Sequence, residues 1–480
     1  MSQTTSHAGH PPATTQPDAR RWRVLVLLCL AQFMVILDVT VVNVALPRMA
    51  ADLGLDRSAL TWVVTAYTLC FGGLMMLGGR LADLLGRRRT FLAGLLLFTT
   101  ASLTAGLAGD ATGMVVARAA QGVGAALLSP AALSILTTTF HGPDRHRALG
   151  VWAALGGGGA AAGVLVGGLL VSGPGWPWVF FVNVPIGLFV AALVPVSVAA
   201  APRHPGRVDL PGALLVTAAS GAVIYGLVRA GDAGWTAPVT VVPIVAGIFL
   251  YGVFALVEQR VAAPLVRLRL LAQRPLLAGF AAMLPASALL ISGFFLCSLL
   301  LQVVLGRSAL QTGLLFLPVA VATVAGAHLA GHTVSRFGPR PLAAAGFAVA
   351  AAGFVLLTGV ESGASAWISV LPGFLLIAAG LGAGFVTATA TALTRVDAQH
   401  AGMASGALNT AHELGAALGV AVVSTIAGAS IDAGPALGGV GGFANAFWAC
   451  ALAAAVAAAV LPVLLPGSPP PATDGPVFAH

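Results

Sequence analysis

The chain has 480 residues, of which 58% are hydrophobic and 8% are charged, and its mean hydropathy is +0.96. A soluble domain cannot bury that much apolar surface, so this composition indicates a polytopic membrane protein. The formal charge is +8, and all 23 basic residues are arginines. They lie in short connectors between apolar segments, which excludes a basic nucleic-acid-binding patch and indicates that the charge marks membrane topology.

Charged or Gly/Pro-rich breaks divide the chain into fourteen apolar segments. Each has about the 20 residues that are needed to cross a bilayer as a helix. In chain order they cover residues 24–46, 60–79, 90–109, 113–136, 149–171, 179–200, 211–228, 238–257, 276–303, 313–331, 342–360, 367–392, 402–428 and 441–465. The polar N-terminal segment lacks the hydrophobic stretch of a signal peptide. The Pro-rich C-terminal tail is predicted to be disordered.

The arginines are distributed unevenly between the two sides of these segments. With the N-terminus inside, 18 of the 23 fall in cytoplasmic segments, four fall outside and Arg118 falls within a span. Short cytoplasmic loops collect positive charge. We therefore expect an even number of crossings in the cell (plasma or inner) membrane, with both termini cytoplasmic.

The connector between the second and third spans reads Gly-Arg-Leu-Ala-Asp-Leu-Leu-Gly-Arg-Arg-Arg, residues 79–89. Its shortness forces an antiparallel hairpin, in which Gly79 and Gly86 allow close helix approach and a tight turn. Asp83 can reach a helix N-terminus or an arginine in one state and release it in another. These residues, with Arg87 and Arg88, are predicted to form a conformational gate. The alternative is an ordinary positively charged cytoplasmic loop.

The sequence pattern of this connector is repeated later in the chain. Residues 331–340 repeat the pattern of residues 79–88 at the same spacing, with Ser335 in place of the acid. Two six-helix halves, separated by two inserted helices, explain this placement. The predicted divisions are a cytoplasmic N-terminal tail, an N-terminal six-helix bundle, two inserted helices with cytoplasmic linkers, a C-terminal six-helix bundle and a disordered tail: residues 1–22, 23–200, 201–275, 276–465 and 466–480.

Ionisable groups inside spans are costly and are functional candidates by default. Asp38 lies in the middle of the first span and Arg118 in the fourth. The two can act as a proton-dependent switch, ionised and paired or protonated and released; a static structural pair is the alternative. Glu413 in the thirteenth span is predicted to be a second proton or cation site, or else a structural hydrogen-bonding group.

Other intramembrane residues complete the candidate site. Gly163, Gly167 and Gly168 in the fifth span build a small-residue face on which another helix can slide. The four cysteines lie singly in separate spans, so we expect no metal site and no disulfide. The polar residues predicted to line a substrate cavity are Asn43, Tyr67, Gln121, Gln302, Asn409 and His412.

Several of these segments together resemble the 14-helix drug:proton antiporters of the major facilitator superfamily, the EmrB/QacA-like branch. The resembling segments are residues 37–47, 62–67, 79–88, 118–124, 176–187, 401–419, and Asp209 with Gly212. The resemblance implies an all-α polytopic membrane protein with the major facilitator fold, two six-helix bundles plus two inserted helices. It also implies that Asp38 is the coupling acid, that Arg118 is its partner, and that Asp83 and Arg87 belong to the cytoplasmic gate.

Three positions depart from the pattern of that family. The antiporter motif of the fifth helix usually reads Gly-Pro-x-x-Gly-Gly, and here Val164 replaces the proline. Pro177 stands where arginine is common, and Glu413 stands where glutamine is common. The first departure weakens the inference to antiport, and the last could change the number or charge of the substrates that are moved.

The function that we expect is proton-coupled efflux of a hydrophobic or amphipathic small molecule, such as an antibiotic, by alternating access. A symporter or uniporter of the same superfamily is the alternative. The chain lacks a nucleophile elbow, a nucleotide loop and a metal-ligand cluster, so we expect no enzyme activity and no cofactor beyond the proton gradient. The expected partners are a lipophilic or cationic substrate and the lipid bilayer, with the chain acting as a monomer.

Overall fold

The computed structural model describes residues 18–466 except for 56, 141, 199–208, 262–263, 265–271, 362, 394–400 and 433–439. Long helices dominate this part of the chain. Their bounds are α1 Asp18–Leu53, α2 Arg57–Leu85, α3 Arg87–Gly106, α4 Ala111–Thr139, α5 Gly142–Ser172, α6 Trp178–Phe181, α7 Asn183–Ser197, α8 Leu210–Ala233, α9 Pro238–Glu258, α11 Arg274–Leu299, α12 Ala309–Phe337, α13 Pro339–Thr358, α14 Leu371–Leu393, α15 Ala401–Asp432 and α17 Gly441–Leu464. Two π-helical turns, η1 Leu300–Val304 and η2 Ala366–Val370, continue α11 and precede α14.

Membrane-crossing length is the common property of these helices, because only a helix satisfies its own backbone hydrogen bonds in lipid. Among the described residues, 12 helical segments are long and apolar enough to cross a bilayer. The 20-residue α3, which begins with three arginines, and the 31-residue α5 are further helices of sufficient length. The all-helical fold is therefore confirmed, and the structure is compatible with fourteen crossings.

The N-terminal bundle consists of α1 to α7, in which α4 packs against α2 and α3, and α1 packs against α5. Glycines let these helices approach closely. A Cβ added to Gly94 on α3 would lie 2.7 Å from the carbonyl oxygen of Gly124 on α4. Close backbone approach of this kind favours helix association in membranes, where no hydrophobic effect drives it.

The C-terminal bundle consists of α11 to α17 and follows the same plan. Helix α14 packs against α11, α12 and α13. Three aromatic rings, from Phe294, Phe316 and Phe374, meet edge to face with centroids 5.0 to 5.3 Å apart. This arrangement is favoured by the quadrupoles of the rings and joins α11, α12 and α14 at one point.

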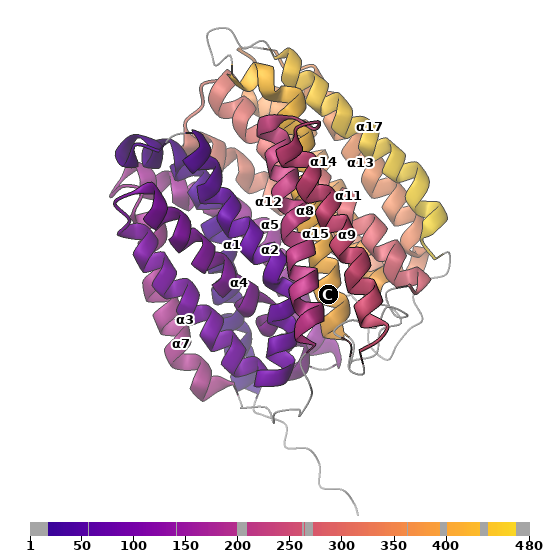
Figure 1. Cartoon of the computed structure of the whole chain (residues 1–480). Coiled ribbons are helices and arrows are strands. Elements are labelled where there is room, and N and C mark those ends of the chain that lie inside the picture. The colour runs from indigo at the N-terminus through magenta and orange to yellow at the C-terminus, as the bar shows by residue number, and fades with distance from the viewer. Residues whose placement is uncertain are drawn as a thin grey trace, which may run out of the picture.

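The two bundles lie side by side, and α8 and α9 lie in front of their junction (Figure 1). Direct contacts between the bundles join α5 to α12 and α2 to α15. Helix α8 contacts both α2 and α15, so it bridges the N-terminal and C-terminal bundles. The inserted pair is thus part of the junction.

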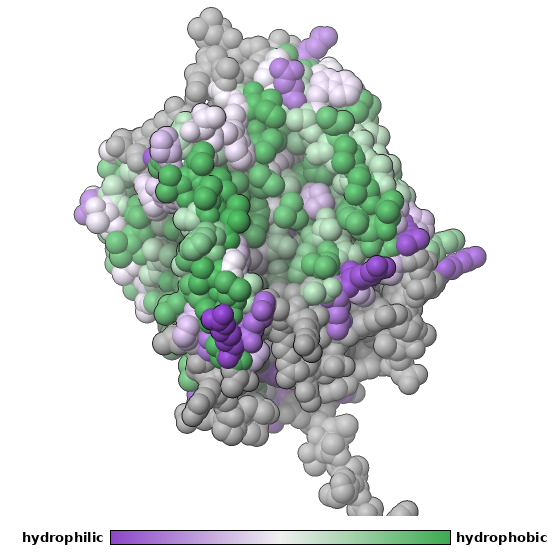
Figure 2. Space-filling view, turned by 45° about the vertical axis from the view of Figure 1, so that its right-hand side comes forward, coloured by the Kyte–Doolittle hydropathy of each residue, from purple (hydrophilic) through white to green (hydrophobic). Residues whose placement is uncertain are grey.

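The surface shows where the bilayer meets the protein. Apolar residues cover the middle of the face in Figure 2, and hydrophilic residues gather toward its ends. On α9, which is little covered by other helices, Val242, Ile248 and Phe249 are 62 to 69% exposed. An exposed apolar surface of this size in a helical bundle is typical of lipid contact.

The structure differs in detail from the sequence-based spans. Helix α1 begins at Asp18, inside the segment assigned to the N-terminal tail. The sixth span is divided into α6 and α7. The other predicted tail, residues 466–480, and the predicted linkers around residues 199–208 and 265–271 lie almost wholly outside the described residues.

Candidate functional site

Asp38 and Arg118 form an ion pair inside the N-terminal bundle. The Arg118 Nη1 atom on α4 lies 2.5 Å from Asp38 Oδ2 on α1. The exposed fractions of the two side chains are 1% and 0%. A charge buried in a bundle needs a partner of opposite sign, because the low-dielectric interior strongly disfavours a single charge. Each residue supplies that partner to the other.

The guanidinium of Arg118 is held on all sides. Its Nη1 also donates to Gln121 Oε1 at 2.9 Å, and its Nε donates to the carbonyl oxygen of Val63 on α2 at 3.0 Å. The guanidinium carbon lies 4.3 Å from the centroid of the Tyr67 ring, a cation–π contact. The position of this cation is therefore fixed by α2 and α4 together.

The carboxylate of Asp38 accepts two further hydrogen bonds. Gln121 Nε2 donates to its Oδ1 at 2.9 Å, and Asn183 Nδ2 on α7 donates to the same atom at 3.2 Å. Both amides also donate to the Ser102 hydroxyl on α3, at 2.7 and 3.4 Å. Five helices of one bundle, α1, α2, α3, α4 and α7, thus contribute to the contacts around the ion pair of Asp38 and Arg118. We call these residues the Asp38 network: Asp38, Tyr67, Ser102, Arg118, Gln121 and Asn183.

Two members of the network were not proposed as site residues. Asn183 lies within residues 176–187, one of the segments that carry the family resemblance, and this was the available signal. Ser102 is one of many hydroxyl residues in apolar spans, and nothing in the sequence distinguishes it. Asn183 Oδ1 and the Tyr67 hydroxyl are buried without a hydrogen-bond partner in the described part of the chain. These two atoms are suited to bind water or a polar substrate group.

Glu413 lies where the two bundles meet. It is half-buried on α15, and a Cβ added to Gly72 on α2 would lie 3.4 Å from its Cβ. The same added Cβ would lie 3.0 Å from Ile224 Cδ1 on α8. The Glu413 carboxylate forms no hydrogen bond or ion pair with another described residue. An acid without a fixed partner at this junction is available to a cation or a proton.

The remaining predicted cavity residues have contacts of their own, apart from the Asp38 network. Gln302 Nε2 on η1 donates to Ser298 Oγ at 3.0 Å. The His412 ring packs against Phe385 with centroids 5.5 Å apart, and its carbonyl oxygen accepts a 2.7 Å bond from Ser287. Asn409 is half-buried on α15. Within the described residues, none of these three bonds to the Asp38 network, and the Asn43 side chain lies outside the described part.

The predicted gate connector is hydrogen-bonded to the end of another helix. Gly86 makes the turn between α2 and α3 at φ +95°. Arg88 Nη1 then donates to the carbonyl oxygens of Pro195 and Val198, at 3.2 and 3.0 Å, where α7 ends. Arg87 is half-buried, and the Asp83 side chain lies outside the described residues. A Cβ added to Gly79 would lie 3.7 Å from Pro130 Cβ, so the structure leaves room for a larger residue there.

The repeated connector of the C-terminal bundle is also hydrogen-bonded to the end of another helix. Gly338 turns at φ +80°, and Arg340 Nε donates at 2.7 Å to the carbonyl oxygen of Leu465, where α17 ends. Arg88 and Arg340 hold equivalent positions in the two copies of the motif. Each caps the carboxyl end of the last helix of its own bundle, where exposed carbonyls and the helix dipole favour a cation.

The glycines of α5 face the helix that carries Asp38. A Cβ added to Gly163 would overlap the Thr40 side chain, and one added to Gly167 would lie 3.1 Å from Val41 Cγ1. Gly168 is buried as well. These contacts lie two and three residues beyond Asp38 on α1. The small-residue face therefore allows α5 to pack beside the Asp38 network.

The described residues contain no group of three or more His, Cys, Asp or Glu side chains that could hold a metal ion. The four cysteines are free. The contacts that the described residues show at this site are an ion pair, hydrogen bonds and a cation–π contact.

Comparison with known proteins identifies a family and several similar transport and resistance proteins. The family model described as Major Facilitator Superfamily matches residues 28–420. The puromycin resistance protein pur8 of Streptomyces alboniger is 41% identical over 417 residues, 85% of this chain and 82% of that protein. The cephamycin export protein CmcT of Amycolatopsis lactamdurans is 40% identical over 86% of each chain.

Two further similarities extend the picture. The multidrug resistance protein Stp of Mycobacterium tuberculosis (strain ATCC 25618 / H37Rv) is 34% identical over 86% of this chain and 77% of that protein. Among solved structures, the human organic anion transporter MFSD10 (TETRAN) matches with a TM-score of 0.61 over 93% of this chain and 100% of that chain. At 15% identity, the latter likeness concerns the fold alone.

Proposed function

Because this multi-pass membrane protein belongs to the major facilitator superfamily, we propose that it exports a hydrophobic or amphipathic small molecule in exchange for protons. The relatives named for puromycin resistance, cephamycin export and multidrug resistance support efflux of antibiotic-like compounds. The site requires no cofactor, since the proton gradient supplies the energy. The chain acts as a monomer in the cell membrane with both termini cytoplasmic.

The observation that carries the proposal is the ion pair of Asp38 and Arg118. When Asp38 is ionised, its charge holds α1 against α4, and Gln121 and Asn183 donate to it. When a proton binds the carboxylate, the charge that pairs with Arg118 is removed and the contact between α1 and α4 weakens. A group that changes the packing of helices on protonation is what couples a proton to a conformational cycle.

The membrane potential can drive such a cycle. Moving one charge across 100 mV supplies about 2.3 kcal/mol. A conformational preference of a few kcal/mol separates the states of a typical two-state protein. One proton per cycle is therefore sufficient to bias alternating access between the two bundles.

The position of Glu413 supports the proposal that the substrate is cationic or zwitterionic. The carboxylate lies at the junction of both bundles and α8, and no described residue neutralises it. A lipophilic cation would gain an ion pair there in a low-dielectric environment, where charges interact more strongly than in water.

Transport into everted membrane vesicles tests the proposal. Respiration acidifies the interior of such vesicles, so an exporter that exchanges protons accumulates its substrate inside. The panel contains puromycin, a cephamycin and a fluorescent lipophilic cation. We expect accumulation of at least one compound, loss of accumulation with an uncoupler, and loss with Asp38→Asn. The matched control is Asp110→Asn, because Asp110 only caps α4 and asparagine caps equally well. Accumulation unaffected by the uncoupler would contradict proton exchange.

A symporter or uniporter is the second candidate. The observation that favours it is Val164, which stands where the antiporter motif has proline. The same vesicles separate the candidates. A uniporter equilibrates its substrate without regard to the proton gradient, whereas a symporter moves substrate out of the acidified interior.

A further inference from the structure

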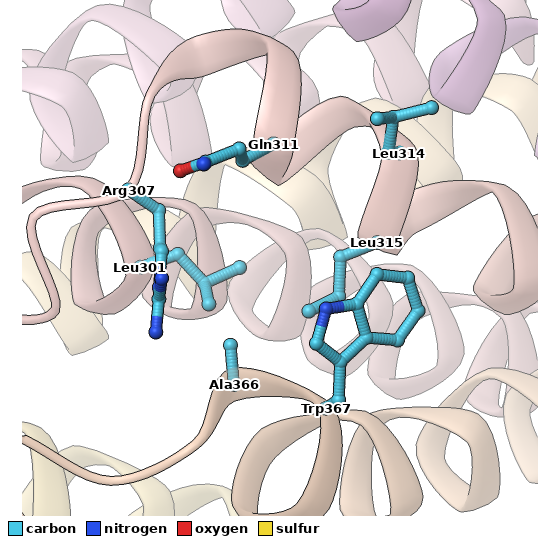
Figure 3. A pocket seen from close by; sticks show the side chains of 7 residues that line it. All are labelled: Leu301, Arg307, Gln311, Leu314, Leu315, Ala366 and Trp367. Atoms are coloured by element: carbon cyan, nitrogen blue, oxygen red, sulfur yellow. The ribbon is translucent and has the colours of Figure 1, made fainter.

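A small hollow lies in the C-terminal bundle, at the end opposite to the Gly338 connector. Its volume is about 100 Å³, and its residues come from η1, the start of α12 and η2 (Figure 3). With both termini cytoplasmic, this end of the bundle is the outer one. Helix ends at this level lie in the headgroup region of a bilayer.

Two irregular turns build the hollow. Leu301 lies on the π-helical turn η1, and Trp367 lies on the π-helical turn η2. π-helical turns are rare and occur frequently at functional sites. After η1 the chain turns back at Gly306, with φ +61°, and the Arg307 N–H donates to the carbonyl oxygen of Leu301 at 2.8 Å. This turn places the Arg307 side chain beside Leu301, with Trp367 on the other side of the hollow (Figure 3).

The rim of the hollow is cationic and rich in donors. The Arg307 guanidinium is exposed, and it forms no hydrogen bond or ion pair with another described residue. Gln311 Oε1 accepts a 3.1 Å bond from the Ser308 N–H in a capping box, which leaves the Gln311 Nε2 donor free to face a ligand. Arg307 and Gln311 both line the hollow (Figure 3), and both can donate to a phosphate group, whose oxygens accept several bonds at once.

The floor of the hollow and the surface that leads away from it are apolar. Leu301, Leu315 and Ala366 are at most 3% exposed and form the floor. Leu314, which lines the hollow, and Val321 lie seven residues apart on one face of α12 and are 44 and 68% exposed. An exposed apolar track therefore runs from the cation toward the middle of the helix.

We propose that this hollow is a binding site for one phospholipid molecule of the outer leaflet. The phosphate binds Arg307 and Gln311, the glycerol backbone rests against Trp367, and one acyl chain follows Leu314 and Val321. Charge complementarity and the continuity of the cationic rim with an apolar track select this ligand. A soluble anion would not use the track, and a neutral lipid would not use the arginine. Arginine and tryptophan are both residues that anchor proteins at this depth.

Native mass spectrometry of the delipidated chain in detergent tests the site. The probe is dioleoylphosphatidylglycerol, and the matched control is Arg48→Ala, which removes an exposed arginine on α1. We expect Arg307→Ala to weaken the tightest binding step about tenfold, as the loss of a charge-assisted bond implies. Arg307→Lys should recover part of the affinity, which separates loss of the site from loss of folding. Equal affinity in the parent and Arg307→Ala, or an equal loss with Arg48→Ala, would overturn the proposal.

Two further ligands separate the parts of the lipid. Dioleoylglycerol has the chains without the phosphate, and glycerol 3-phosphate has the phosphate without the chains. Both should bind the parent at least about tenfold more weakly than the phospholipid, because each lacks one of the two contacts. A phospholipid brominated on its acyl chains should quench the fluorescence of the parent more than that of Trp367→Phe. Glycerol 3-phosphate that binds as tightly as the lipid would make this a simple anion site and would overturn the proposal.

Discussion

Glu413 stands where glutamine is common in the antiporter family that the sequence motifs resemble. Replacing it with glutamine keeps the size and removes the charge. We predict that Glu413→Gln lowers export of a cationic compound about tenfold and leaves export of a neutral compound nearly unchanged, since a lost ion pair of about 1.4 kcal/mol corresponds to tenfold. Side-by-side export of one dication and one neutral compound measures this ratio. An unchanged ratio would show that Glu413 has a structural role.

The sequence could predict some residues of the site and not others. Asp38 and Arg118 could be selected because a bilayer makes unpaired charge expensive, and two charges in one bundle are natural partners. Ser102 and Asn183 could not be selected by the same reasoning, because neutral polar side chains in spans carry a small energetic cost. Their role emerges only when α3 and α7 are packed beside Asp38.

At the scale of the element, the two connectors hold their bundles together at the same end. We predict that Arg88→Ala and Arg340→Ala each destabilise the protein by about 1 kcal/mol, because each removes a charged donor from the end of a helix. Thermal unfolding in detergent measures the loss, and Arg89→Ala, which removes an exposed neighbour, is the control.

The Arg88→Ala variant also tests whether the connector acts as a conformational gate. Arg88→Ala should lower turnover more than substrate affinity, because the connector lies away from Glu413 and the Asp38 network. Equal losses in turnover and affinity would argue that the arginine acts on the substrate site or on folding alone.

Helix α8 is attached to both bundles at different heights. Its first half packs Ala213 and Val216, with Phe254 of α9, against Met76 and Leu77 of α2. Its second half packs Leu227 and Ala230 against α15. The second patch is supported by an exposed 3.2 Å bond from Trp235 to Thr425. Ile244 of α9 packs against the second patch, as Phe254 does in the first. When the bundles tilt apart, one of the two patches must open.

A disulfide across the second patch tests this motion. A Cβ added to Gly231 would lie 3.8 Å from the Ser424 Cβ, which is the usual separation in a disulfide. In a background without the native cysteines, we predict that Gly231→Cys with Ser424→Cys blocks transport when oxidised and regains it when reduced. Gly231→Cys alone should be insensitive to oxidation. Parent-like transport by the fully cross-linked protein would show that α8 stays with the C-terminal bundle.

The spans could be predicted from the sequence, but the irregular elements within them could not. Hydropathy located the spans, because the length of a helix that crosses a bilayer is fixed by the thickness of the hydrocarbon. The division of the sixth span at Val182 and the π-helical turns η1 and η2 follow from tertiary packing, which hydropathy does not report. Both π-helical turns lie at the proposed lipid site.

For the whole molecule, the two copies of the connector correctly indicated two related bundles. The parallel between Arg88 and Arg340 gives that symmetry a physical basis, since each bundle closes on itself in the same way. The bundles differ in their charges, however. The N-terminal bundle encloses the paired acid Asp38, whereas Glu413 of the C-terminal bundle lies at the junction and has no partner among the described residues. We infer a division of labour, in which one bundle handles the proton and the other handles the charge of the substrate.

If Asp38 carries the coupled proton, binding of a transported compound should release that proton into solution. The purified protein is placed in weakly buffered solution with a pH indicator, and a transported compound is added. We predict that the parent and Asp110→Asn release a proton on binding and that Asp38→Asn binds the compound without releasing one. Undiminished proton release by a folded, substrate-binding Asp38→Asn variant would contradict it.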